Sequence, residues 1–113
     1  MELAIIMIGG KWKPLILWAL GANGMMRFGE LRRLLSGASQ KMLTQQLREL
    51  ETDGLIVREA HPQVPPRVEY SLTTRALRLV PILNQLDVWA QAVEQEKSEA
   101  HASSIEDASP SNP

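Results

Sequence analysis

The chain has 113 residues, of which 44% are apolar, and twelve Lys and Arg stand against thirteen Asp and Glu. This length predicts one domain, or one domain with a tail, with a modest core that a partner subunit would help to complete. The sequence contains no cysteine and two distant histidines, His61 and His101, which excludes disulfides, zinc–cysteine sites and a thiol nucleophile and disfavours a metal site.

The net charge of −1 is the sum of segments with opposite charge. Between Lys11 and Arg78, eleven basic residues face six acidic ones, a net charge of +5. Residues 98–113 carry a charge of −3 and only one large aliphatic side chain, Ile105. Such a segment cannot bury enough apolar surface to offset the entropy of ordering. We therefore predict a folded body at residues 1–97 and a disordered acidic tail at 98–113.

The predicted elements begin with a short apolar segment at residues 2–8. It lacks the basic leader and the small-residue cleavage site of a signal peptide, and it ends at Gly9-Gly10, far short of the roughly 20 residues that cross a bilayer. A helix of this length is unstable alone but could pack on a partner. We therefore expect a cytoplasmic chain with no membrane partner.

The segment at residues 12–20 is predominantly apolar and predicts the first long helix. A proline in its first turn is tolerated because the N–H that it lacks would have no partner there. The glycines from Gly21 to Gly24 are predicted to end the helix. We expect Trp12 and Trp18 to belong to the core rather than to a ligand platform.

Two further helices are predicted in the middle of the chain. Residues 28–35 place one Phe and three Leu at helical spacing, and residues 40–53 place three Leu in one narrow arc. Ser39 offers a hydroxyl cap to the second of these helices, and Gly54 suits the position after its end. The helix at 40–53 therefore has a core-facing side and an opposite, polar side.

Residues 55–60 and 67–72 predict a β-hairpin with a loop stiffened by prolines. Thr73 or Thr74 can cap a final long helix, with a kink or a restart at Pro81, because proline lacks an N–H and crowds the preceding turn. Two short helices joined by a tight glycine-containing turn and followed by a hairpin are the order of a winged helix-turn-helix. The predicted fold is therefore mainly α with a small β-hairpin wing.

The polar side of the helix at 40–53 predicts a nucleic-acid interface. It presents a cation, a hydroxyl, an amide and a guanidinium, the groups that read base edges or hold phosphates in a major groove. A polar stripe alone is also typical of an ordinary surface helix, but this one lies within the stretch of charge +5 and on one element of a known docking architecture. The predicted DNA-binding residues are Arg32 and Arg33 as phosphate clamps, Arg67 on the wing, and Ser39, Gln40, Lys41, Thr44, Gln45 and Arg48 on the helix and at its start.

Four blocks of the sequence stand in a fixed order: Gly9-Gly10-Lys11-Trp12 followed by Leu15-Ile16-Leu17, residues 27–33, residues 39–51 and residues 65–73. Together, within a region from about Ile5 to Trp89, they resemble the HxlR-type bacterial transcriptional regulators. The resemblance implies a winged-helix homodimer that binds a pseudo-palindromic operator through the helix at 40–53. It also implies a dimer interface built from the N-terminal and C-terminal helices.

The sequence departs from the family's pattern in three places, of which the first is its short N-terminal helix. Many members carry a cysteine ahead of the Gly-Gly-Lys-Trp block, at a position that falls just before Met1 here, so thiol sensing is not expected within these 113 residues. Whether the native N-terminus extends upstream stays open. Gln40 stands where the family often has proline, and the loss of proline from a first helical turn costs a little stability.

An apolar repeat in the C-terminal part of the body supports the implied interface. From Leu72 to Val93, apolar residues are spaced alternately by four and three, which is typical of a seam between two helices. The alternative is that this helix folds back on its own core. The predicted interface residues are Leu3, Ile6, Leu79, Leu83, Leu86, Trp89, Ala90 and Val93.

The predicted function is sequence-specific regulation of transcription by a homodimer on double-stranded DNA, with no catalysis, cofactor or metal. The sequence shows no catalytic carboxylate pair, Ser/His/Asp set or phosphate loop. It does not separate repression by occupying promoter DNA, which we expect, from activation by contacting polymerase. The alternatives are a winged-helix protein-interaction module without specific DNA binding, and a regulator that also holds an apolar effector between its dimer helices. The operator, the target genes and the effector stay unknown.

Overall fold

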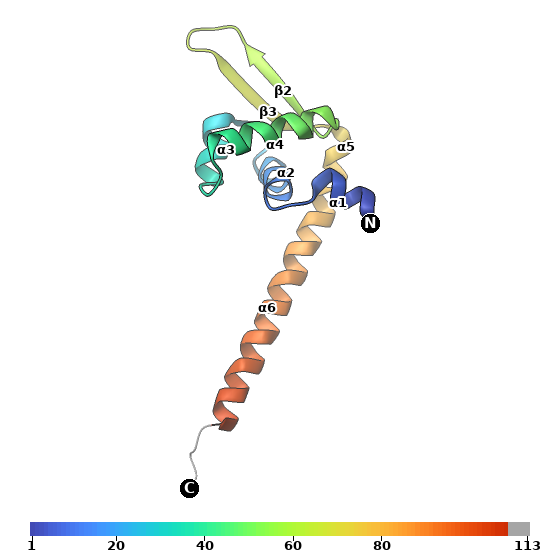
Figure 1. The fold of residues 1–113 in the computed structure, drawn as a ribbon, viewed down its shortest axis with the longest axis vertical. Coiled ribbons are helices and arrows are strands. Elements are labelled where there is room, and N and C mark those ends of the chain that lie inside the picture. Colours follow the sequence, from blue (N-terminus) through green and yellow to red (C-terminus); the bar gives the residue numbers. More distant parts are fainter. Residues whose placement is uncertain (109–113) are drawn as a thin grey trace. The chain divides into compact units, whose positions relative to one another are not determined.

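The computed structural model describes the backbone of residues 1–108 and the side chains of residues 1–102. The chain divides into two compact units, Met1–Leu83 and the part from Asn84 onward. The mainly helical fold with a small antiparallel sheet confirms the predicted fold class. The elements in chain order (Figure 1) are α1 (Glu2–Ile8), α2 (Trp12–Asn23), β1 (Met26–Arg27), α3 (Phe28–Leu34), α4 (Gln40–Thr52), β2 (Ile56–His61), β3 (Arg67–Leu72), α5 (Thr74–Leu77) and α6 (Val80–Ala108).

The sheet has three antiparallel strands in the order β1-β3-β2. β2 and β3 pair from Ile56 opposite Leu72 to His61 opposite Arg67, which confirms the predicted hairpin. The loop that joins them projects away from the helices of the same unit (Figure 1). Strand β1 has two residues, too few for a periodic pattern, so sequence reasoning does not find it. Its pairing with β3 alone defines it.

Helix α4 forms where the sequence predicts it, because both of its ends carry local signals. The Ser39 hydroxyl accepts the Met42 N–H at 3.1 Å, and Gly54 adopts a left-handed φ of 73° just past the helix. The arc of leucines is buried in the core of the unit. The predicted core-facing side of this helix is therefore confirmed.

Helix α2 is longer than predicted because it continues through Gly21. A Cβ atom at Gly21 would lie 2.8 Å from a methyl carbon of Val80, so this glycine permits close packing and does not end the helix. Gly24, with φ 78°, lies at the actual end. Trp12 packs against the core as expected. Trp18 is 41% exposed, so its expected place in the core was wrong, because the buried side of α2 faces elsewhere.

The predicted long C-terminal helix is broken in two. Thr73 caps the short helix α5 by accepting the Ala76 N–H at 3.2 Å, and its hydroxyl donates to the Gly54 carbonyl at 2.8 Å. The chain then restarts as α6, with Pro81 in the first turn, where a missing N–H is tolerated. The expectation of a restart at this proline is confirmed.

The apolar repeat from Leu72 to Val93 does not lie on one helix. It begins in strand β3 and passes through α5 before it enters α6. Ala76 and Leu83 are buried in the core of the unit Met1–Leu83, and Leu79 packs against that core. For this part the alternative interpretation holds, because the helical break turns these side chains inward. The rest of the repeat, in α6 beyond Leu83, is largely exposed.

Helix α6 continues past Lys97 to Ala108, where the sequence predicted a disordered tail from residue 98. Extending an existing helix needs no new nucleus, and this stretch is rich in the helix formers Ala and Glu. The Gln95 amide also donates to the Glu99 carboxylate one turn away, at 3.1 Å. Low apolar content therefore did not prevent helix formation here. Residues 109–113 of the predicted tail lie outside the described residues.

No single helix within residues 1–108 is long and apolar enough to cross a membrane. By length and composition alone, the pair of α1 and α2 would suffice, but the two helices are bent by 73° at the break between them. Much of the apolar surface of α2 is buried in the core of its own unit.

Candidate nucleic-acid interface

The polar side of α4 borders an open hollow of about 570 Å³. The core beneath the helix holds its leucines, so the helix cannot roll without exposing them to water. The structure therefore brings the residues predicted on this helix together on one surface. The residues that line this hollow, called here the α4 hollow, are Gln40, Lys41, Thr44, Gln45 and Arg48.

An ion pair with a buried lysine holds α4 against α2. The Lys13 ammonium donates to the Glu49 carboxylate, with Nζ and Oε1 2.8 Å apart, and Lys13 is only 7% exposed. This hydrogen bond and the positive charge hold the pKa of Glu49 below its ordinary value of 4.5. Sequence reasoning missed the pair, although a single lysine within an apolar helix signals a charge that needs a partner. The pair helps to set the direction in which the polar side of α4 faces.

The start of α4 contacts α3 through a polar interaction. Arg32 Nη1 donates to Gln40 Oε1 at 3.4 Å, which brings two predicted DNA-binding residues side by side. Ser39, also predicted, uses its hydroxyl to cap the helix. Arg33 lies apart from this group and lines a separate hollow of about 520 Å³ with Arg27. Within the described side chains, α3 thus offers two guanidiniums that face different surroundings.

Arg67, a predicted DNA-binding residue, is paired with a carboxylate of the wing. Its Nε lies 2.7 Å from Glu69 Oε1, and His61 Nε2 lies 3.4 Å from the same oxygen. The strand register puts these groups together, because His61 is opposite Arg67 and Glu59 is opposite Glu69. His61 is half-buried at the end of β2.

The wing cluster also contains potential metal ligands. Ligand atoms of Glu59, His61 and Glu69 lie within 4.8 Å of one another, a spacing that could hold an ion. However, the guanidinium of Arg67 already neutralises the Glu69 carboxylate, which disfavours a second cation at this point. The cluster is best described as an Arg67–Glu69 ion pair with His61 beside the same carboxylate.

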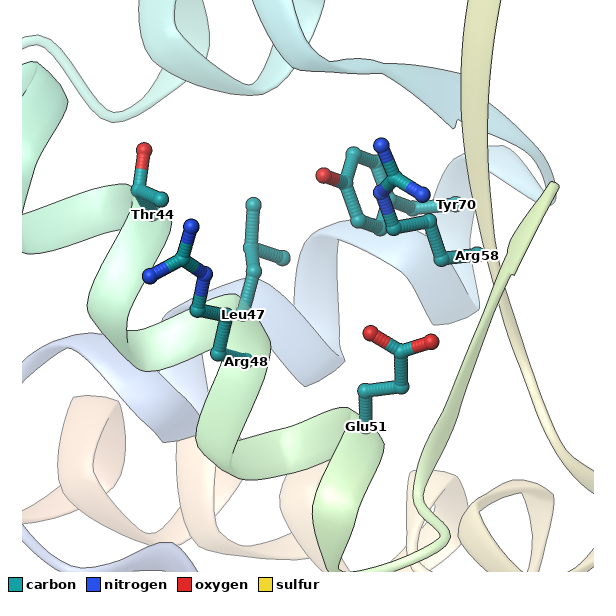
Figure 2. A pocket seen from close by; sticks show the side chains of 6 residues that line it. All are labelled: Thr44, Leu47, Arg48, Glu51, Arg58 and Tyr70. Carbon is teal, nitrogen blue, oxygen red and sulfur yellow. The ribbon is translucent and has the colours of Figure 1, made fainter. Parts of the chain in front are cut away.

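A second hollow, of about 390 Å³, lies between α4 and the sheet (Figure 2). It adjoins the α4 hollow, because Thr44 and Arg48 line both. On the strand side it is lined by Arg58 of β2 and Tyr70 of β3, which stand opposite each other in the register. The residues that line this second hollow, called here the helix–strand hollow, are Thr44, Leu47, Arg48, Glu51, Arg58 and Tyr70.

Arg58 is a candidate that sequence reasoning missed. It stands two positions after the buried Ile56 on β2, so both side chains share the face of the sheet that carries the buried Tyr70. The alternation of side chains between the two faces of a β-strand could have indicated Arg58 from the sequence. The structure thus adds one strand guanidinium to the basic residues predicted on the helices.

An amphipathic helix with its polar side exposed, set on a small helical core and flanked by a β-hairpin, defines a winged helix-turn-helix protein. Residues 7–98 match the HxlR-like helix-turn-helix family. The chain therefore belongs to this family and is a transcriptional regulator, not an enzyme.

Relatives of known name cover most of the chain. MalR of Fusobacterium mortiferum is 53% identical over 90 residues, which are 80% of this chain and 85% of that protein. The HTH-type transcriptional regulator YtcD of Bacillus subtilis is 51% identical over 88 residues, 78% of this chain and 69% of that protein. The solved structure of the redox regulator HypR in its reduced form is 43% identical and has a TM-score of 0.80, covering 87% of this chain and 96% of that chain.

Proposed function

We propose that this regulator binds double-stranded DNA sequence-specifically, as a homodimer on a pseudo-palindromic operator, and represses by occupying promoter DNA in the cytoplasm. The observation that carries the proposal is the polar side of α4. Five polar or cationic side chains share one open hollow there, while the opposite side of the same helix is buried in the core. A helix presented in this way fits the major groove, which admits an α-helix.

The side chains on α4 suggest a division between base contacts and phosphate contacts. Lys41, Thr44, Gln45 and Arg48 carry the groups that read base edges in a major groove. The Thr44 hydroxyl and the Arg48 guanidinium, which also line the helix–strand hollow, are equally suited to hold a phosphate. Arg32, beside the start of α4, is placed to hold a phosphate that flanks the groove. Phosphate contacts position the protein without reading the base sequence, and they make its affinity depend on salt.

Exposed apolar side chains support the homodimer. Helix α1 has no buried residue, and its Leu3 is 71% exposed, as Ile6 is to a similar extent. In α6, considered by itself, Leu86 and Trp89 are also mostly exposed. Apolar surface of this kind is typical of protein interfaces. A dimer formed through such helices would place two copies of α4 roughly one DNA turn, about 34 Å, apart.

Selection of bound sites from a random duplex library, with the full chain as bait, tests the proposal. We expect a palindromic motif with half-sites about 10 base pairs apart and an affinity that falls as salt rises. A selected motif without internal symmetry would contradict the homodimer on a palindrome. Absence of salt-dependent binding to every duplex would favour the protein-interaction alternative, for which the exposed apolar helices would then be the binding surface.

A further inference from the structure

We propose that the helix–strand hollow binds one phosphodiester of the DNA backbone and that Arg58 is a DNA-binding residue of this regulator. The inference rests on the proposed DNA-binding function and extends the interface from the helices to strand β2. It assigns a ligand class to a site in which a helix guanidinium and a strand guanidinium line the same space.

The donors that line the hollow are suited to an anion. Arg48 of α4 and Arg58 of β2 contribute guanidiniums, and Thr44 and Tyr70 contribute hydroxyls. Figure 2 shows Thr44 and Arg48 on the helix side of this space, and Arg58 beside the Tyr70 ring on the strand side. Guanidiniums have donors only, and their hydrogen bonds to phosphate oxygens are stronger than those between neutral groups.

Both guanidiniums are available to a ligand. Among the side chains of residues 1–102, the ion pairs involve other cations, and neither Arg48 nor Arg58 lies within ion-pair distance of a carboxylate. Arg67, in contrast, is already paired with Glu69. Of the two arginines on the wing strands, Arg58 is therefore the one free to bind phosphate.

The position of the hollow favours a phosphate of bound DNA over a free anion. It adjoins the α4 hollow through two shared residues. If α4 fills a major groove, a DNA strand that borders this groove would therefore pass the mouth of the helix–strand hollow. Glu51 lines the same space and places a carboxylate in it (Figure 2). The two guanidiniums outnumber this single carboxylate, so the lining keeps a net positive charge that favours an anion such as a phosphate of the DNA backbone.

The first test compares Arg58→Ala with the wild-type chain by fluorescence anisotropy, on a selected duplex and on a random duplex over a series of salt concentrations. We expect both duplexes to bind about tenfold more weakly at low salt, the loss of one charge-assisted hydrogen-bonding group. The slope of log affinity against log salt should fall in magnitude by about one. Arg58→Lys should keep most of the slope, and Arg78→Ala, which removes the same charge outside both hollows, should change little.

The second test locates the phosphate. Duplexes that carry a single neutral methylphosphonate are titrated with the wild-type chain and with Arg58→Ala. One position should weaken wild-type binding and have no further effect on the variant. Glu51→Gln, which removes the opposing charge, should tighten binding to both duplexes.

Four results would decide against the proposal in distinguishable ways. If Arg58→Ala keeps wild-type affinity and salt slope while its circular dichroism shows a folded protein, the inference is overturned and the proposed function stands. A loss confined to the selected duplex, or no methylphosphonate position coupled to Arg58, would overturn the phosphate assignment. Failure of the wild-type chain to bind any duplex would overturn the proposed function, and this inference with it.

Discussion

Some cationic residues of the unit Met1–Leu83 are paired with a carboxylate of the same protein, and others are available to bind a ligand. Lys13 is held by Glu49, and Arg67 lies against Glu69, so both are occupied inside the protein. Arg48 has no such partner among the described side chains and faces an open hollow. At the scale of the residue, the type of side chain shows which cations could bind DNA, and the partner decides which of them are free to do so.

Replacing Lys13 should change the acid titration of Glu49. In the wild-type chain the pKa of Glu49 is lowered, first by the Lys13 hydrogen bond and then by its charge. The pair therefore stabilises the fold above about pH 4.5, the ordinary pKa, and this contribution is lost as pH falls through the lowered pKa. In Lys13→Met, the Glu49 midpoint measured by NMR should rise toward 4.5.

Urea unfolding at several pH values provides the matching stability measurement. Lys13→Met should lack the part of the acid-induced loss of unfolding free energy that the pair causes in the wild-type chain. Lys11→Met, which removes an exposed cation two residues away, serves as the control. An unchanged Glu49 midpoint in Lys13→Met would show that the pair does not form in solution.

Releasing Arg67 should strengthen DNA binding without changing its sequence preference. Glu69→Gln removes the carboxylate that lies 2.7 Å from the Arg67 guanidinium. A freed cation on the wing can then neutralise a phosphate, so affinity for any duplex should rise several-fold and the salt slope should steepen by about one. Glu59→Gln is the matched control, because it removes the same charge from the wing while leaving Arg67 paired. Equal effects of the two substitutions would attribute the change to net charge alone.

At the scale of the element, α4 combines signals of short and long range. The Ser39 cap, the arc of leucines and Gly54 are all local, and each was predictable because it depends on residues within a few turns of one another. The direction of the polar side depends also on Lys13, which is distant in sequence and belongs to α2. In the C-terminal part the local signal misled. The apolar repeat looked like one helical seam, but the break between α5 and α6 placed part of it in the core.

Arg48→Ala tests whether α4 reads bases. If Arg48 contacts a base edge, specific binding should weaken by about 1–3 kcal/mol, and binding to a random duplex should change less. Arg32→Ala should instead weaken both duplexes alike and flatten the salt slope, as expected for a phosphate contact. Anisotropy titrations on the selected and random duplexes separate these outcomes. Equal losses on both duplexes would assign Arg48 to the phosphate backbone.

At the scale of the whole molecule, the exposed apolar side chains indicate an interface with a partner. Of the predicted interface residues, Leu83 is buried and Leu79 half-buried in the unit that contains them, so both belong to its core. Leu3, Leu86 and Trp89 are exposed and remain candidates for an interface between two copies. The homodimer stays a prediction whose strongest support is this uncovered apolar surface.

A charge placed on α6 should prevent dimer formation. Leu86 is 53% exposed, and Leu86→Glu would bring a carboxylate into an apolar interface, where its desolvation is unfavourable. We expect monomers by light scattering and weak binding to a palindromic site. Gln85→Glu adds the same charge at the neighbouring exposed position and should leave the dimer intact. Persistent dimers of Leu86→Glu would remove this part of α6 from the interface.

The sequence by itself determined the fold class, the helix that faces outward and the hairpin beside it, because periodicity, caps and turn residues act over short stretches of chain. It also determined the lack of any thiol within these 113 residues. Only the tertiary structure decided which cations are paired and which line a common hollow. Lys13 meets Glu49, and Arg58 lines one hollow with Arg48, although each pair joins separate elements. Contacts between residues distant in sequence follow from topology and packing, and no local pattern records them.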